Sequence, residues 1–207
     1  VANSVICTGN SVSFDVTPYR TSYSKNYAYT NIYAGKEYEA ASVKLIWEGK
    51  NGLISSLSLK GTQLSVKTNG SKGNAVVAIC DEKGIIRWSF HIWCTGGDTP
   101  RSVLYENYAK ARFEVMDRNL GALAASPTDH ENSMGLIYQW GRKDPFPSKN
   151  EDNVFTPTGS GVFQTCFPTI SGESELEDLL QQMVTNPANF VKSADGLDDE
   201  NAMKLWG

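Results

Sequence analysis

The chain has 207 residues, of which 40% are hydrophobic and 20% charged, a composition typical of folded globular proteins. This composition excludes disordered, collagen-like and coiled-coil chains. Its 19 basic and 23 acidic residues give a net charge of −4 at pH 7, which offers no basic surface for nucleic acid. No stretch approaches the roughly 18 consecutive apolar residues of a membrane span, so we expect no membrane span in this chain.

Short alternating patterns run through the first 95 residues. Apolar and polar residues alternate over 12–16, 43–47 and 64–66, which predicts strands with one buried face. No helical period occurs before about residue 100, and the turns are rich in Gly, Ser and Asn. We therefore predict an all-β, immunoglobulin-like sandwich over residues 1–95.

A hairpin is the clearest unit of this region. The apolar run 75–80 and the strand 85–93 are separated by Asp-Glu-Lys-Gly, a four-residue turn that ends in glycine. Successive side chains of a strand point to opposite faces, so one face of the second strand is uniformly apolar. We predict that this face lies in the core: Ile86, Trp88, Phe90 and Ile92.

The pattern changes after residues 96–100, Gly-Gly-Asp-Thr-Pro, which we predict to be a linker. The remainder combines a short strand over 113–116, long polar loops and an amphipathic helix over 173–184 with acids in its first turn. We therefore predict a second domain over residues 101–207, of an irregular α+β type.

The four cysteines are scattered, and none forms a C-x-x-C pair. The sequence leaves open whether they are buried thiols or disulfides: Cys7, Cys80, Cys94 and Cys166. His91 and Cys94 have a metal-like spacing, but residues i and i+3 of a strand point to opposite faces. We therefore do not expect these two to share a metal.

Two charged clusters stand beside aromatic residues in the second half. We predict a structural role, in which charged side chains satisfy buried backbone groups, for the clusters Asp117-Arg118-Asn119 and Arg142-Lys143-Asp144. We also predict a structural role for the strand residues Trp88, His91 and Trp93. The alternative is a polar floor with stacking rings, a ligand site formed by Tyr138, Trp140, Arg142 and Asp144.

Motifs for nucleophilic, phosphate-binding or metal catalysis are missing from the sequence. Paired carboxylates for a glycosidase could come from Asp117, Asp129, Glu131 and Asp144, although such pairs are common at unknown separation. Residues 195–201 are rich in oxygen donors that suit calcium, without the spacing of an EF-hand. We expect a protein without catalytic residues or cofactor, with calcium left as an option.

Several segments resemble the exported surface proteins of Bacteroidetes known as fimbrillin-family or major-paralogous-domain proteins. The resemblance lies in residues 74–78, 88–93, 116–122 and 135–146. It implies an immunoglobulin-like module followed by a domain similar to C-type lectins and formylglycine-generating enzymes. It also implies an extracellular, cell-surface protein, lipid-anchored through a precursor segment.

Two departures from that family affect the second domain. Family members continue into a Cys-Pro-x-Gly-Trp-Arg type of segment, whereas this chain stops at Gly207, so we expect the second domain to be incomplete here. The cysteine pair that carries catalysis in formylglycine-generating enzymes has no counterpart, because Cys166 stands alone. The resemblance in fold therefore does not transfer that activity.

The leading hypothesis is a non-enzymatic adhesin or fimbria-associated protein that binds a glycan or a host or bacterial surface protein. Other fimbrial subunits are further candidate partners. One alternative is a secreted carbohydrate-active or protein-modifying enzyme that uses Asp117, Glu131 or Asp144. Another is a structural pilin subunit that assembles by strand exchange.

Overall fold

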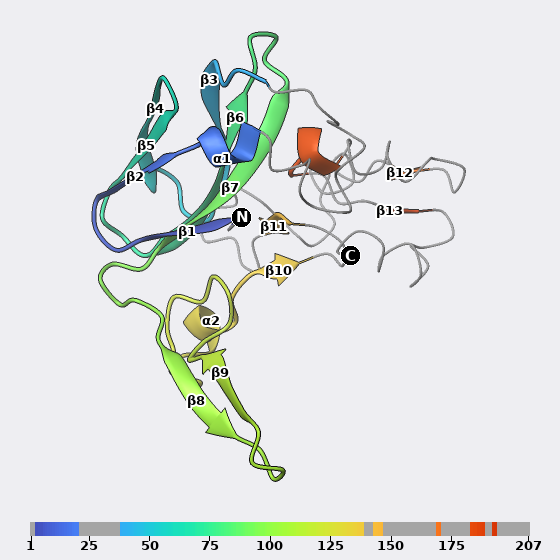
Figure 1. Ribbon diagram of the computed structural model, residues 1–207. Helices are drawn as coiled ribbons and strands as arrows, with labels where there is room; N and C mark the ends of the chain where they lie inside the picture. Colours follow the sequence, from blue (N-terminus) through green and yellow to red (C-terminus); the bar gives the residue numbers. More distant parts are fainter. Residues whose placement is uncertain are drawn as a thin grey trace.

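A computed structural model describes residues 3–20, 38–138, 143–146, 169–170, 183–188 and 192–193 (Figure 1). The described part is predominantly β-structure. Its strands are β1 Ser4–Cys7, β2 Ser11–Asp15, β3 Ser42–Glu48, β4 Ile54–Lys60, β5 Gln63–Thr68, β6 Gly73–Cys80, β7 Ile86–Cys94, β8 Ser102–Glu106, β9 Arg112–Met116, β10 Ile137–Tyr138, β11 Pro145–Phe146, β12 Thr169–Ile170 and β13 Lys192–Ser193. The labelled helices are single turns, α1 Thr17–Arg20 and α2 His130–Ser133.

The first seven strands form two sheets that pack face to face as a sandwich. One sheet has the order β1-β7-β6-β3 and the other has the order β2-β5-β4. β1 runs parallel to β7, while the other pairs in the two sheets are antiparallel. Because β1 and β2 follow each other in the chain but join different sheets, the chain crosses from one layer to the other directly after Cys7.

Aromatic rings and aliphatic side chains fill the space between the two sheets. The ring of Phe90 lies 5.0 Å from that of Phe14 and 4.6 Å from that of Tyr19, both in edge-on geometry. Leu64 and Val66 of β5 are fully buried in the same cluster. Burying side chains of this size stabilises the fold by about 1.5–3 kcal/mol each, so this layer is the principal core.

The predicted hairpin is confirmed. β6 and β7 pair over their whole length, and the backbone N–H of Gly84 donates to Asp81 at 2.9 Å to close the turn. Gly84 has φ of 75°, a left-handed conformation that favours glycine. Trp88, Phe90 and Ile92 are buried in the core, as predicted. The prediction was wrong for Ile86, which is only half-buried and lies next to the register shift of the β6–β7 pair.

The opposite face of β7 is buried as well. Ser89, His91 and Trp93 on that face are between 0% and 1% exposed. A sheet in which only one face is covered would leave these side chains in water. The covering residues come from the second half of the chain, as described below.

Several elements of the first half were missed by the sequence pattern. β1 is only four residues long, and β4 contains a register shift between Ile54 and Ser56 that interrupts its alternation. The turn α1 begins after Asp15, whose carboxylate accepts from the backbone N–H of Thr17 at 3.1 Å. Such capping is enough for one helical turn, without a longer helical period.

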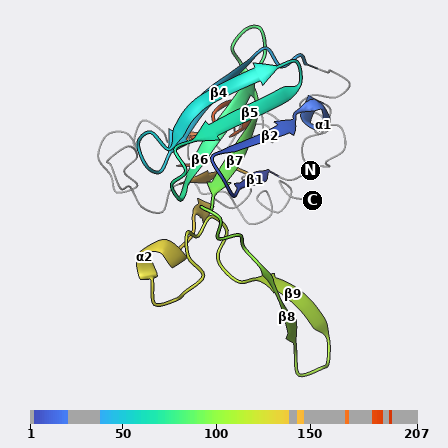
Figure 2. The ribbon, with the colours of Figure 1, turned by 90° about the vertical axis from the view of Figure 1, so that its left-hand side faces the viewer.

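The second half begins with a projecting hairpin. Among the strands that the structure describes, β8 and β9 pair with each other alone, and they extend away from the sandwich (Figures 1 and 2). The strand predicted over 113–116 is thus confirmed as part of β9. Of the helix predicted over 173–184, residues 183 and 184 are helical and the others lie outside the described residues.

Candidate binding surface

A hydrogen-bonded chain joins the outer face of β7 to the segment after the linker. The carboxamide of Asn74 donates to the backbone carbonyl of Gly121 at 2.8 Å and contacts His91 Nε2 at 2.9 Å through its oxygen. The other ring nitrogen of His91 lies 2.9 Å from the Ser4 hydroxyl. The His91 imidazole therefore joins β1 to β6, and Asn74 extends the chain of hydrogen bonds to the segment around Gly121.

These partners determine the form of the His91 ring. Since the Asn74 amide group faces Gly121, its oxygen faces the imidazole, which requires Nε2–H as donor and leaves Nδ1 to accept from Ser4. Burial lowers the pKa of His91 from 6.5 to about 3. The ring is neutral at neutral pH, and its two nitrogens hydrogen-bond Ser4 of β1 and Asn74 of β6.

A second buried polar cluster lies at Ser89, two residues before His91 on the same face of β7. The Ser89 hydroxyl donates to Asp144 Oδ1 at 2.7 Å, and Lys143 Nζ lies 2.8 Å from both carboxylate oxygens of Asp144. Lys143 Nζ also donates to the Ser89 carbonyl at 3.2 Å and lies 4.4 Å from the centre of the Trp88 ring. All of these polar groups are buried and paired, as a low-dielectric environment requires.

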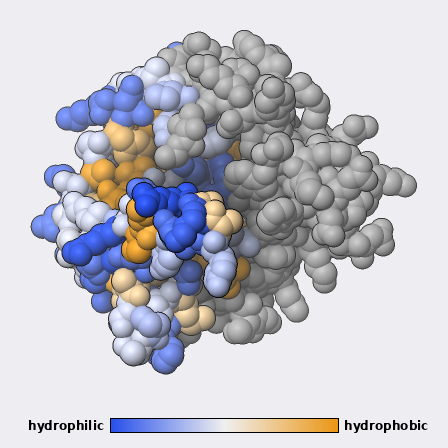
Figure 3. All heavy atoms as spheres, turned by 60° about the horizontal axis from the view of Figure 1, so that its bottom comes forward, coloured by the Kyte–Doolittle hydropathy of each residue, from blue (hydrophilic) through white to orange (hydrophobic). Residues whose placement is uncertain are grey.

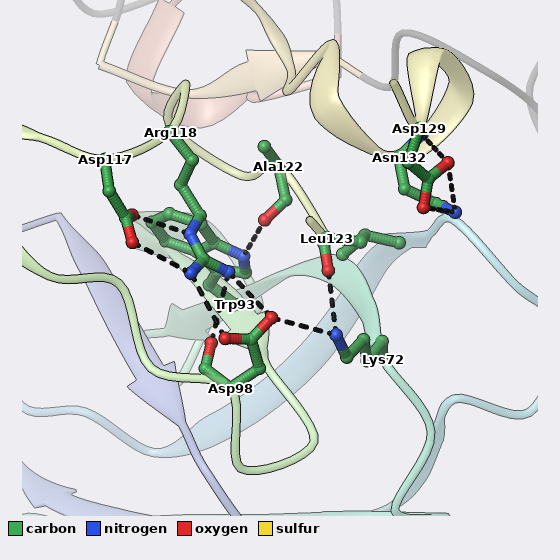
Figure 4. Close-up of polar contacts among 9 residues, drawn as sticks. All are labelled: Lys72, Trp93, Asp98, Asp117, Arg118, Ala122, Leu123, Asp129 and Asn132. Carbon is green, nitrogen blue, oxygen red and sulfur yellow. Dashed lines mark hydrogen bonds and ion pairs between the residues drawn. The ribbon is translucent and has the colours of Figure 1, made fainter. Parts of the chain in front are cut away.

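The predicted linker is fixed to the second half by Arg118 (Figure 4). Its guanidinium bonds the Asp117 carboxylate at 2.8 and 3.1 Å and the Asp98 carboxylate at 3.1 and 3.2 Å. Lys72 adds a contact of 3.1 Å to Asp98, and the Trp93 indole donates to the Ala122 carbonyl at 3.2 Å. Arg118 and Lys72 lower the pKa of Asp98 to about 2.

The residues predicted to have a structural role are thus found in such contacts. Arg118 bonds both Asp117 and Asp98, an arrangement we call the clamp. The Asn119 carboxamide donates to the carbonyls of Ser133 and Met134 at 3.2 and 3.3 Å. His91 and Trp93 hold the outer face of β7, as given above. Trp88 lies mainly in the core, where its ring is 5.8 Å from that of Tyr19.

The residues predicted as a ligand site divide into two groups. Tyr138 is 37% exposed, its side chain hydrogen-bonds with Ser4, and burial raises its pKa above the ordinary value. Asp144 is 1% exposed and belongs to the buried Lys143 group. Trp140 and Arg142 lie outside the described residues, so the ligand site stays a prediction.

Within the described ranges, one face of the β8–β9 hairpin is an accessible apolar surface. Tyr105 pairs with Phe113 and Val103 pairs with Val115, and paired residues of an antiparallel ladder share a face. The rings of Tyr105 and Phe113 lie nearly parallel, with centroids 6.3 Å apart. We call these four residues the hairpin face.

The hairpin face is open to solvent. Its exposed fractions are 38% for Val103, 52% for Tyr105, 48% for Phe113 and 44% for Val115. Tyr108, in the turn between the strands, is fully exposed. Figure 3 views the molecule from the side of the hairpin and shows hydrophobic residues among hydrophilic ones on that side. Contiguous apolar patches of this kind commonly mark contact surfaces.

The opposite side of the hairpin is more polar and stabilises the turn. Glu106 forms ion pairs with Lys110 at 2.9 Å and with Arg112 at 3.1 Å. The Asn107 side chain accepts from the backbone N–H groups of Ala109 and Ala111 at 2.9 and 3.0 Å. The turn is therefore shaped by its own side chains, while the hairpin face makes no such polar contact within the strands.

An open groove lies at the base of the hairpin. Its volume is about 520 Å³, and its lining is formed by Val115, Met116, Asp117, Arg118, Asn119, Leu120, Ala124, Ala125, Pro127 and Ser133. The charged groups within it, Asp117 and Arg118, are bonded to each other. The groove is thus continuous with the hairpin face through Val115.

The predicted carboxylates occupy separate settings. Asp117 bonds Arg118, Asp144 bonds Lys143, and Asp129 caps α2 by accepting from the Asn132 backbone N–H. Glu131 lies in α2. Among the described residues, no group of three or more potential metal ligands converges. Residues 195–201, the calcium option, lie outside them.

None of the helices in the described ranges is both long and apolar enough to cross a membrane. Comparison of the chain with protein-family models, with curated proteins and with solved structures found no match.

Proposed function

We propose that the chain is a non-enzymatic, adhesin-like binding protein that contacts a protein partner through the hairpin face. The observation that carries this proposal is the outward-facing set of Val103, Tyr105, Phe113 and Val115 on a hairpin that projects from the sandwich. An isolated two-stranded hairpin is only marginally stable in water. A partner that covers the hairpin face would remove this apolar area from solvent and stabilise the hairpin.

The chemistry of the hairpin face favours a protein over a glycan. Sugars are held by stacking together with several hydrogen bonds to polar side chains. Three of the four side chains are hydrocarbon, and the only polar group is the Tyr105 hydroxyl. Aromatic and aliphatic residues of this kind are those enriched at the centres of protein interfaces.

The surrounding architecture supports a role as a presenting scaffold. We propose that the sandwich is of immunoglobulin-like type, which the strand orders β7-β6-β3 and β2-β5-β4, with β1 at one edge, support. We propose that residues 101–207 belong to a C-type-lectin-like domain and that the protein is extracellular, at the cell surface and lipid-anchored. The resemblance of 116–122 and 135–146 to surface proteins of Bacteroidetes supports these parts of the proposal.

Binding to immobilised proteins tests the proposal. The chain is passed over fibrinogen, fibronectin, collagen and laminin, with mucin glycans as the sugar surface, and dissociation constants are measured by biolayer interferometry. We expect micromolar or tighter binding to a protein surface. Phe113→Ser should weaken it at least about 10-fold, because aromatic anchors at interface centres contribute on the order of 1–3 kcal/mol.

Leu104→Ser is the matched control, because Leu104 is 60% exposed and lies on the opposite side of the same hairpin. It should change the dissociation constant by less than about threefold. Equal losses in the two variants would contradict the assignment to one face. Binding to mucin glycans alone would favour a glycan ligand. Absence of binding to every surface at about 50 μM would contradict the adhesive role.

A further inference from the structure

Two of the four cysteines are direct neighbours across the β1–β7 pair. Cys7 is the last residue of β1 and Cys94 the last residue of β7, and the parallel register places them opposite each other. Adjacent strands lie about 4.7–4.9 Å apart, within the 4.4–6.8 Å Cα separation that a disulfide accepts. The backbone therefore already has a spacing that permits a covalent link.

The side chains also meet. Both residues are 1% exposed and belong to the same core cluster, so their side chains point to the same face of the sheet. Burial, together with the neighbouring Cys7 thiol, raises the pKa of Cys94, and the Cys7 thiol donates to the Gly9 carbonyl oxygen at 3.2 Å. Cys80, the other described cysteine, is on β6 and pairs in register with Ser42 and Ile86.

We propose that Cys7 and Cys94 form a disulfide when the chain folds in an oxidising environment. The step forms one S–S bond and removes one hydrogen from each thiol. A small-molecule or protein disulfide accepts the two electrons and two protons and is reduced to two thiols. The exchange passes through a mixed disulfide between one of the two cysteines and the oxidant.

The bond is expected to form before the sandwich closes. Burial and the neighbouring Cys7 raise the pKa of Cys94 to about 12, which leaves little thiolate to react in the folded chain. In the unfolded chain both thiols are accessible and ordinary. A native chain that folded in reductant should therefore oxidise slowly, and a chain that refolds with a disulfide donor should oxidise readily.

The consequence concerns the edge strand β1. The link would join β1 to the last strand of the sandwich and enclose β2 to β6 in a closed loop. β1 carries only four residues and one sheet neighbour, so it is the easiest strand of its sheet to detach. With the link formed, β1 could not be exchanged for a strand of another subunit, which opposes assembly by β1 exchange.

Peptide mapping tests the proposal directly. The chain is refolded with a mixture of reduced and oxidised glutathione, its free thiols are alkylated, and it is digested with trypsin without reduction. Each cysteine lies in its own tryptic peptide: 1–20, 73–83, 88–101 and 150–192. We expect a linked pair of 1–20 and 88–101, with Cys80 alkylated.

Thermal unfolding of the same samples gives the second readout. Reductant should lower the melting temperature by about 5–15 °C, the range expected for loss of a long-loop disulfide in a domain of this size. Cys80→Ser is the matched control, because it replaces another buried cysteine. It should retain both the linked 1–20 and 88–101 peptides and the fall in melting temperature with reductant.

Alkylated, unlinked 1–20 and 88–101 peptides after oxidative refolding would overturn the proposal. A link from Cys7 to the Cys80 or Cys166 peptide would also overturn it. Cys94→Ser should abolish both the link and the response to reductant. If that variant does not fold, the map of the unaltered chain still decides the question.

Discussion

His91 carries no charge at neutral pH because its imidazole is buried between Ser4 and Asn74. In the folded chain it takes up a proton only near pH 3, whereas in the unfolded chain the pKa is near 6.5. As the pH falls below 6.5, the unfolded chain binds a proton that the folded chain does not. The resulting stability loss grows until the pH reaches the folded pKa.

This linkage gives a prediction at the residue scale. Between pH 6.5 and 4.5, His91 should remove about 2 kcal/mol from the free energy of unfolding. His91→Gln, which keeps an N–H donor for Asn74 but does not titrate, should lose correspondingly less over the same interval. Urea denaturation at pH 6.5, 5.5 and 4.5 measures both. If the unaltered protein and His91→Gln lose the same free energy of unfolding between pH 6.5 and 4.5, the assignment of this pH dependence to His91 is contradicted.

The sequence placed His91 on a strand face opposite the core, but it gave no sign that this face is covered. Its partners Asn74 and Ser4, and Gly121 that Asn74 bonds in turn, are far from it along the chain, and period-2 alternation reports only which residues share a face. Gly121 has φ of 82°, and an added Cβ would lie 2.5 Å from the Leu136 side chain. That close approach explains a glycine that the sequence pattern left without a role.

At the scale of elements, the β7–β11 region depends on a buried ion pair. Lys143 and Asp144 lie directly before β11 and bond Ser89 of β7. Removing one member of such a pair leaves an uncompensated buried charge, whereas removing both can be close to neutral.

We therefore predict that Lys143→Met destabilises the protein by about 3–5 kcal/mol. The double variant Lys143→Met with Asp144→Leu should recover a large part of that loss. Chemical denaturation of Lys143→Met, Asp144→Leu and the double variant, compared with the unaltered protein, gives a double-mutant cycle that measures the coupling energy between the two positions. Additive losses, with no coupling between the positions, would show that the pair does not act as a unit.

The strands that were predicted show an apolar pattern in the sequence. β2, β3, β5, β6 and β7 each present a regular or continuous apolar pattern, although β3 and the β6–β7 pair contain register shifts. β4 was missed because two consecutive serines, Ser55 and Ser56, interrupt its alternation, and β1 because four residues are too few to show a period. β8 contains the apolar run Val103–Tyr105, which periodicity alone does not resolve.

On the scale of the whole molecule, several buried hydrogen bonds join the sandwich to the segment after the linker. Asn74, Ser89 and Trp93 each hydrogen-bond a residue beyond position 120. Arg118 adds the clamp between Asp98 and Asp117. The predicted linker 96–100 therefore does not behave as a free tether, because its central carboxylate is held from both sides.

Among the described residues of the second half, the β8–β9 hairpin extends away from the sandwich (Figure 2). The candidate surface could not be predicted from the sequence. The pattern over 113–116 predicted a short strand, and a strand by itself does not show whether an apolar face is covered or exposed. Only the three-dimensional arrangement shows that this face is open.

Hydroxyl-radical footprinting of the chain, alone and bound to the immobilised protein that it recognises, tests the central claim most directly. Aromatic side chains report their own solvent access in this measurement. We predict that labelling of Tyr105 and Phe113 falls at least about threefold in the complex, as burial in an interface core requires, while buried Phe90 stays unlabelled in both states. Equal labelling of Tyr105 and Phe113 in the free and bound chain would contradict the account.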